Sequence, residues 1–147
     1  MSSLYSGPII IESTAVLRTR SIENGKLPGY INSSTYFISE NSHIPTISLI
    51  SEPEILWDEE IGIYENEYKQ REIPITLYYF TEEDELGFTV NAGVRLGGEN
   101  IWTKPQKPFT IYTRNRFGDD FINYRLFDNK QISRFSRIVL RNGGDDW

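Results

Sequence analysis

A glycine-rich segment and the lysine that follows it are the residues of this sequence best suited to bind phosphate. Residues 93–98 hold three glycines near the end of an apolar run, where backbone amides can approach an anion. No lysine follows at the spacing of a Walker loop, and a β-bulge or hairpin bend explains the glycines equally well. Lys107 opens the next apolar run. Its charge would neutralise nucleotide phosphates there, although an ordinary surface lysine is the simpler interpretation of this residue alone.

The acidic segments 58–60 and 82–85 are candidates for a calcium site, because hard cations prefer clustered carboxylates. They lack the alternating ligand spacing and the central glycine of a calcium loop, which favours solvated turns. The single histidine, His43, excludes histidine-cluster metal sites. It could act only as a lone base, and its polar surroundings favour a solvated linker residue. The absence of cysteine excludes disulfides, thiolate nucleophiles and cysteine-based metal sites.

Charge is distributed unevenly along the chain, whose formal net charge is −6. Residues 104–141 contain nine Lys or Arg residues and three Asp residues, so the rest of the chain is strongly acidic. The basic third could form a local phosphate-attracting surface, or it could be a strand surface with ordinary exposed charges. The acidic whole argues against a general nucleic-acid binder. No apolar run approaches the ~20 residues that a membrane helix needs, so we expect no membrane span.

The elements that would position these residues are β-strands. A length of 147 residues allows one domain, or one domain with a fragment of another, and an aromatic content of 14% is typical of a globular β protein. Alternating apolar residues predict strands at 14–20, 34–38, 45–50, 73–80, 87–96, 107–114 and 136–141. A turn at Asn24-Gly25, a short helical turn at 52–57 and a short extended piece at 61–64 complete the prediction. We therefore expect a mainly β fold with few short helices.

A polar joint at residues 39–43 is the expected domain boundary. Residues 1–40 have the pattern of the last strands of a small antiparallel β-sandwich, whose edges need covering. Residues 44–147 have the pattern of a β-rich antiparallel sheet. The sequence ends in a loop at Trp147, where nothing is left to pack around the tryptophan, so we expect a fragment of a longer protein.

Several of these segments, in this order and spacing, resemble the start of the CotH-type (spore coat protein H) atypical kinase family. The matching segments are 45–49 (PTISL), 52–58 (EPEILWD), 61–64 (IGIY), 87–88 (GF), 91–98 (NAGVRLGG), 105–112 (PQKPFTIY), Arg114, 117–118 (FG), 123–127 (NYRLF) and 137–147 (RIVLRNGGDDW). The resemblance covers about residues 44–147. Upstream, 6–10 (SGPII), 14–20 (TAVLRTR) and 35–38 (TYFI) resemble the end of a chitobiase/hexosaminidase carboxy-terminal-like module, also called Fn3-associated, which often precedes a CotH domain.

The resemblance implies a secreted or cell-surface kinase that binds ATP with Mg or Mn and phosphorylates serine in proteins. The family's catalytic and metal-binding aspartates lie further along than this chain reaches, so no catalytic or metal-binding residue is assigned and the fragment alone is expected to be inactive. Lys107 is the nearest match to a nucleotide-facing lysine, and Arg95 is the second cofactor-binding candidate. The sequence departs from the family at Pro108, where Ser is usual, and at Leu96-Gly97, where His-Gly is common. The fold implied for 44–147 is a sheet like the amino-terminal lobe of a kinase.

The expected partners are a protein substrate or neighbouring domains of the same polypeptide. The alternative is a non-enzymatic structural or adhesion β-module in a larger surface or multi-subunit assembly, which would associate through exposed sheet edges. Carbohydrate binding by exposed aromatic residues is a third possibility. Against it, Trp57, Trp102 and Trp147 are expected to be core or loop anchors rather than sugar-stacking platforms.

Overall fold

Residues 3–40, 43–97 and 106–142 are the part of the chain that the computed structural model describes. They form a mainly β protein of antiparallel sheets, and within these ranges there is one short α-helix. The predicted mainly β class is confirmed at this level. The chain divides into two compact units, Met1–Ser42 and His43–Trp147.

The first unit contains a two-stranded antiparallel sheet of β1 (Ala15–Thr19) and β2 (Asn32–Tyr36). Gly25 has a φ of 77°, the left-handed conformation that the predicted turn requires. The second strand begins two residues before its predicted range. None of the described residues of this unit is buried, so the sheet has no core of its own within them. A two-stranded sheet without a core is marginally stable by itself.

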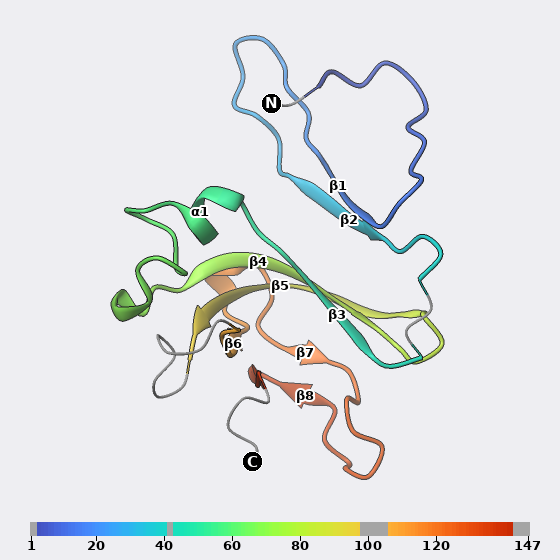
Figure 1. The fold of residues 1–147 in the computed structure, drawn as a ribbon, viewed down its shortest axis with the longest axis vertical. Helices are drawn as coiled ribbons and strands as arrows, with labels where there is room; N and C mark the ends of the chain where they lie inside the picture. Colours follow the sequence, from blue (N-terminus) through green and yellow to red (C-terminus); the bar gives the residue numbers. More distant parts are fainter. Residues whose placement is uncertain (1–2, 41–42, 98–105, 143–147) are drawn as a thin grey trace. The chain divides into compact units, whose positions relative to one another are not determined.

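The second unit is built on a five-stranded antiparallel sheet with the order β3-β4-β5-β6-β9 (Figure 1). Its strands are β3 (Thr46–Ile50), β4 (Ile73–Phe80), β5 (Leu86–Leu96), β6 (Phe109–Tyr112) and β9 (Arg137–Leu140). The long hairpin of β4 and β5 is its centre, and a register shift between Tyr79 and Phe80 marks a bulge near the hairpin turn. Each strand lies within or overlaps a predicted range. The largest difference is β6, which is shorter than the predicted 107–114.

One face of this sheet carries the hydrophobic core, because side chains alternate between the two faces of a strand. Leu77, Ala92 and Ile111, from three adjacent strands, are 0% exposed. Ile73 lies opposite Val94 and is also buried. Each fully buried leucine, isoleucine or valine side chain contributes about 1.5–3 kcal/mol to the hydrophobic stabilisation. The packing of this face therefore fixes the register that orients the residues on the other face.

Two segments supply side chains that pack against the core face. They are α1 (Pro53–Trp57) with the turn after it, and the hairpin of β7 (Ile122–Asn123) and β8 (Arg134–Phe135). The helix begins at a proline, as predicted, because the first helical position needs no amide donor. Ile122 is 1% exposed and anchors the hairpin in the core. The β7–β8 hairpin was not predicted, since its strands are only two residues long.

Residues 61–64 were predicted to be extended, but they form a turn. Asp58 explains the difference. Its Oδ1 accepts hydrogen bonds from the backbone amides of Glu60 (2.9 Å) and Ile61 (3.0 Å), and its carbonyl oxygen accepts one from the amide of Gly62 (2.8 Å). The two amide donors hold the pKa of Asp58 below its ordinary value. Local hydrogen bonds to an aspartate thus override a short apolar alternation.

The turn places two side chains of the predicted extended piece in or beside the core. Ile63 is 3% exposed, and the ring of Tyr64 stacks on Trp57 with centroids 4.1 Å apart. The same tyrosine meets Phe109 of β6 edge-on at 6.1 Å. Burial raises the pKa of Tyr64. Trp57, the last residue of α1, therefore anchors the turn that follows the helix, although 57% of the residue remains exposed.

Candidate functional site

Lys107, the predicted nucleotide-facing lysine, lies just before β6 and forms an ion pair with Glu67. Its Nζ is 2.9 Å from Oε2 of Glu67, the first residue of the 3-10 helix η1 (Glu67–Lys69), and the two side chains are only 10% and 16% exposed. The amide of Gly97 donates to the carbonyl oxygen of Pro108 (3.1 Å), so the end of β5 runs beside this position. An ion pair this sheltered from water is stronger than an exposed one. Lys107 is therefore held in a nearly buried position and is not an ordinary surface lysine.

Arg95, the second cofactor-binding candidate, lies on the sheet face opposite to the core. It is in register with Thr110 of β6, and its guanidinium lies 5.1 Å from the ring centre of Tyr112. The guanidinium of Arg114 lies 4.8 Å from the centre of the same ring. The ring of Tyr112 thus makes cation–π contacts with both guanidinium groups. Arg95 belongs to this arginine cluster, whereas Lys107 has a different partner.

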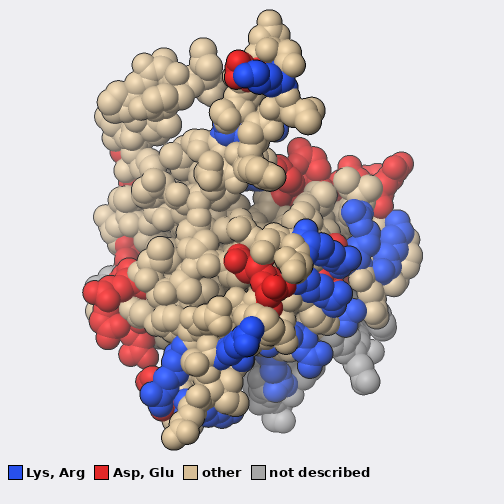
Figure 2. Space-filling view, turned by 180° about the vertical axis from the view of Figure 1, so that it is seen from behind, with Lys and Arg blue, Asp and Glu red and all other residues tan. Residues whose placement is uncertain are grey.

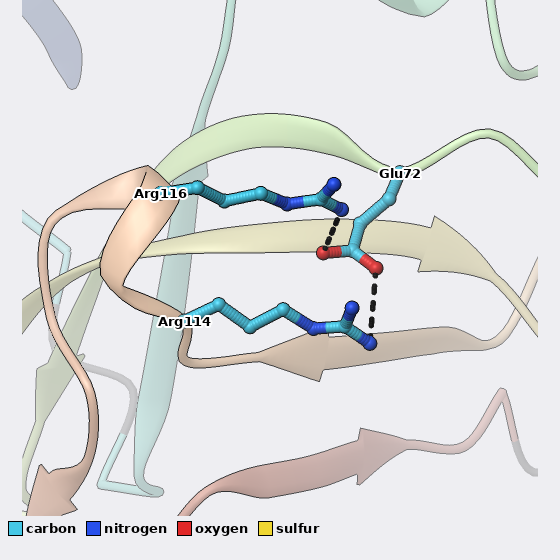
Figure 3. Close-up of polar contacts among 3 residues, drawn as sticks. All are labelled: Glu72, Arg114 and Arg116. Atoms are coloured by element: carbon cyan, nitrogen blue, oxygen red, sulfur yellow. Dashed lines mark hydrogen bonds and ion pairs between the residues drawn. The ribbon is translucent and has the colours of Figure 1, made fainter.

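A single carboxylate ties two arginines to the edge of this face (Figure 3). Glu72, the residue before β4, lies with Oε1 2.8 Å from Nη2 of Arg116 and Oε2 3.4 Å from Nη2 of Arg114. The glutamate side chain is 11% exposed, whereas the arginine side chains are 58% and 48% exposed. Arg114 follows β6, and Arg116 lies in the 3-10 helix η3 (Asn115–Phe117). The carboxylate is sheltered under two cations that still reach solvent.

Basic side chains lie on the right at mid-height and along the lower part of the space-filling view, with acidic side chains between and beside them (Figure 2). Among the residues that the structure describes, Glu72 supplies the one carboxylate that contacts the cluster of Arg95, Arg114 and Arg116. The local charge is thus positive but partly neutralised. Such a surface suits a small anion better than an extended polyanion, since the whole chain carries −6.

The glycines of the 93–98 segment serve close packing in the part that the structure describes. A Cβ on Gly93 would lie 2.3 Å from Cε2 of Phe117 and 2.6 Å from Oε1 of Glu72, and one on Gly97 would lie 2.6 Å from Oγ1 of Thr110. The amide of Gly97 is already bonded to a carbonyl oxygen, as described above. The hypothesis that these amides bind phosphate is therefore wrong for Gly97, and packing explains both glycines. Gly98 lies outside the described residues.

The remaining sequence candidates occupy loops. The amides of Glu83 and Glu85 each lie 3.3 Å from Oγ1 of Thr81, so a threonine organises the second acidic segment. Within the described ranges, no three His, Asp or Glu side chains are placed to hold a metal ion. His43 is exposed, with a φ of 49°. The other two tryptophans, Trp102 and Trp147, lie outside the described residues. No helix in the described part of the chain is long and apolar enough to cross a membrane.

Sequence reasoning missed the carboxylates that hold the basic residues. Glu67 and Glu72 are separated from their partners by about forty residues of sequence, so no local spacing connects them. One signal was available for Glu72. It directly precedes a predicted strand, and antiparallel pairing of that strand with 87–96 brings its start beside Arg95. The two arginine neighbours of Tyr112 were likewise not predicted.

Comparison with protein families, with curated proteins and with solved structures finds no match for this chain.

Proposed function

We propose that residues 44–147 form the amino-terminal part of a secreted or cell-surface CotH-type atypical protein kinase, preceded by the end of a chitobiase/hexosaminidase carboxy-terminal-like module. In the full-length protein, Lys107 would contact the phosphates of ATP bound with Mg or Mn, and Arg95 would be a secondary contact. Serine in a protein would be the phosphoryl acceptor. This chain by itself would be inactive, because phosphoryl transfer needs a metal-holding carboxylate and a base that its motifs do not provide.

The observation that carries the proposal is the ion pair of Lys107 and Glu67. Protein kinases require their nucleotide lysine, which lies on a strand of the amino-terminal lobe, to be paired with a glutamate from a neighbouring helical element. Here the lysine adjoins a strand of a five-stranded antiparallel sheet, and the glutamate opens a short helical turn 2.9 Å away. Both side chains are largely shielded from solvent, which suits a lysine held in place to contact a nucleotide. A lysine that served only to make the surface soluble would not need a sheltered ion pair.

The first unit supports the two-module organisation through its lack of a core. None of its described residues is buried, and Leu4, Leu27 and Tyr30 are more than 90% exposed. Apolar side chains so exposed need further strands or a partner to cover them. A β-sandwich module would provide that cover.

Nucleotide binding is tested by the thermal midpoint of the chain with ATP and either MgCl₂ or MnCl₂. At an ATP concentration 100 times Kd, the midpoint should rise by roughly 5–10 °C. Lys107→Ala should abolish the rise, and Lys130→Ala, at an exposed lysine, should preserve it. Because Lys107→Ala leaves Glu67 without its cation, Lys107→Met combined with Glu67→Gln provides a variant with both charges removed. A rise that persists without Lys107, or no rise with either metal, would refute the nucleotide role.

The open edges of the second sheet favour the alternative of a non-enzymatic structural or adhesion module. Within the described residues, β3 and β9 each have one neighbouring strand, and Val139 on β9 is 53% exposed. Exposed edges of this kind pair with other chains. Sedimentation at rising concentration would detect such association. Val139→Lys should suppress it, because charged side chains protect an edge, whereas Ile132→Lys, at a similarly exposed residue outside any strand, should not.

A further inference from the structure

A groove of about 640 Å³ opens where β6 ends and β9 begins. Its lining residues are Tyr112, Thr113, Arg114, Arg134, Phe135, Ser136 and Arg137. Three of the seven are arginines, three carry hydroxyl groups, and none is acidic. A concave surface with three guanidinium groups and no carboxylate in its wall favours an anion.

The sheet places these side chains around the groove. Tyr112 lies directly opposite Arg137 across the β6–β9 pair, and the amide of Thr113 donates to the carbonyl oxygen of Ser136 (3.1 Å), which extends the pairing by one step. Arg114, two residues after Tyr112, returns to the same side of the chain. Arg134 comes from β8, which the β7 pairing holds in place. The position of each arginine is thus set by backbone pairing.

The three arginines differ in the carboxylate and aromatic partners that their guanidinium groups already contact. Arg114 shares Glu72 with Arg116 and lies over Tyr112, and Arg134 lies over the ring of Phe121 at 3.5 Å. Stacking on a ring orients a guanidinium without removing its charge. Arg137 is exposed and has no acidic partner within the described residues. One carboxylate therefore serves a groove with three cations, and Arg137 is the cation with the most capacity for a ligand.

We propose that this groove binds a phosphate group, either as free phosphate or as the monoester on a phosphorylated side chain. A phosphate carries nearly two negative charges and three or more acceptor oxygens at neutral pH. The planar fork of a guanidinium matches that geometry in a bidentate manner, and several arginines around one site give the charge that a dianion needs. The hydroxyl group of Ser136 is available as a further donor to such a ligand. The groove is distinct from Lys107, so the inference does not depend on the nucleotide proposal.

The test is an NMR titration of the chain with three probes: inorganic phosphate, a phosphoserine peptide and the same peptide with serine. Both phosphate probes should give saturable shifts at the amides of Thr113 and Ser136, and the serine peptide should give none. Tighter binding of the phosphopeptide would assign the site to a phosphorylated chain, and equal binding would assign it to the free anion. Equal shifts with the serine peptide, or no saturable shift with either phosphate probe, would overturn the proposal.

Variants separate the groove from general charge attraction. Arg137→Gln should weaken phosphate binding by about tenfold, the loss expected for one charge-assisted contact. Arg20→Gln removes an exposed arginine from the first unit and should leave the affinity unchanged. Glu72→Gln should strengthen binding, because it removes the negative charge beside Arg114. Similar losses in Arg137→Gln and Arg20→Gln would reject a specific site. Lys107→Ala should leave this titration unchanged, which distinguishes a failure here from a failure of the nucleotide proposal.

Discussion

Replacing Glu72 with glutamine should destabilise the second unit, because this carboxylate holds two arginines over the non-core face of the sheet. The substitution preserves the size of the side chain and one carbonyl acceptor, and it removes the charge. Oε1 and Oε2 lie 2.8 Å and 3.4 Å from the nearest nitrogens of Arg116 and Arg114. What remains after the change is two like charges beside each other and beside Arg95, which shares Tyr112 with Arg114.

The size of the effect follows from the exposure of the three side chains. Breaking a fully buried pair costs about 3–5 kcal/mol, and exposed pairs are worth about 0.2–1 kcal/mol. Glu72 is 11% exposed, but its partners are 48% and 58% exposed, so water screens the charges that remain. We therefore expect Glu72→Gln to lower the free energy of unfolding by about 1–2 kcal/mol. The coupling to Arg116 should exceed that to Arg114, because its contact is 0.6 Å shorter.

Urea unfolding followed by tryptophan fluorescence measures this effect, since all three tryptophans lie in the second unit. The midpoint of Glu72→Gln should fall by about 0.5–1 M. A double-mutant cycle with Arg116→Gln should give a coupling energy of about 0.5–1 kcal/mol that shrinks at high salt. A midpoint equal to that of the unchanged chain, or a coupling below about 0.2 kcal/mol, would show that the pair is only a surface contact and refute this reasoning.

Three further changes test other contacts. Gly93→Ala should cost about 1–3 kcal/mol in the same urea assay, because its Cβ would overlap the ring of Phe117. Asp58→Asn should reduce the acid sensitivity of stability. The pKa of Asp58 is lowered by folding, so its contribution is complete above about pH 4 and is lost as the pH falls through the lower folded value. Tyr79→Phe should reduce alkaline sensitivity. Burial raises the pKa of Tyr79, so stability is complete below about pH 10 and is lost above it. Urea midpoints across pH that match the unchanged chain would contradict either titration prediction.

The strands of the second unit were predictable because their apolar residues alternate over long runs. Residues 73–80 and β4 agree at both ends, and the buried Ile73, Ile75 and Leu77 show why: every second side chain enters the core. The prediction was wrong at 61–64, where hydrogen bonds to Asp58 decide the conformation. The β7–β8 hairpin was missed, because two-residue strands carry no periodic signal.

The sequence allowed the basic residues of the candidate site to be predicted, but not the residues that hold them in place. Both Lys107 and Arg95 were identified as residues worth testing, but the carboxylates and the ring that position them come from distant parts of the chain. Pairing of charges across a sheet depends on strand order and register, and a single sequence specifies neither directly. The arginine-lined groove needs both, since its walls come from β6, β8 and the start of β9. The excess of basic residues at 104–141 was compatible with a phosphate-attracting surface or with ordinary exposed charges, and it did not specify where on the sheet the cations would lie.

The ion pair of Lys107 constrains how a phosphate could reach this lysine. The Nζ of Lys107 lies 2.9 Å from Oε2 of Glu67, and this ion pair fixes the position of the ammonium group. The carboxylate nevertheless cancels most of the local positive field, and it would repel a phosphate approaching without a metal ion. The arginine groove has the opposite character, with a partly neutralised but positive wall open to solvent. A phosphate without metal should therefore prefer the groove, whereas a nucleotide whose charge is balanced by Mg or Mn is the form suited to Lys107.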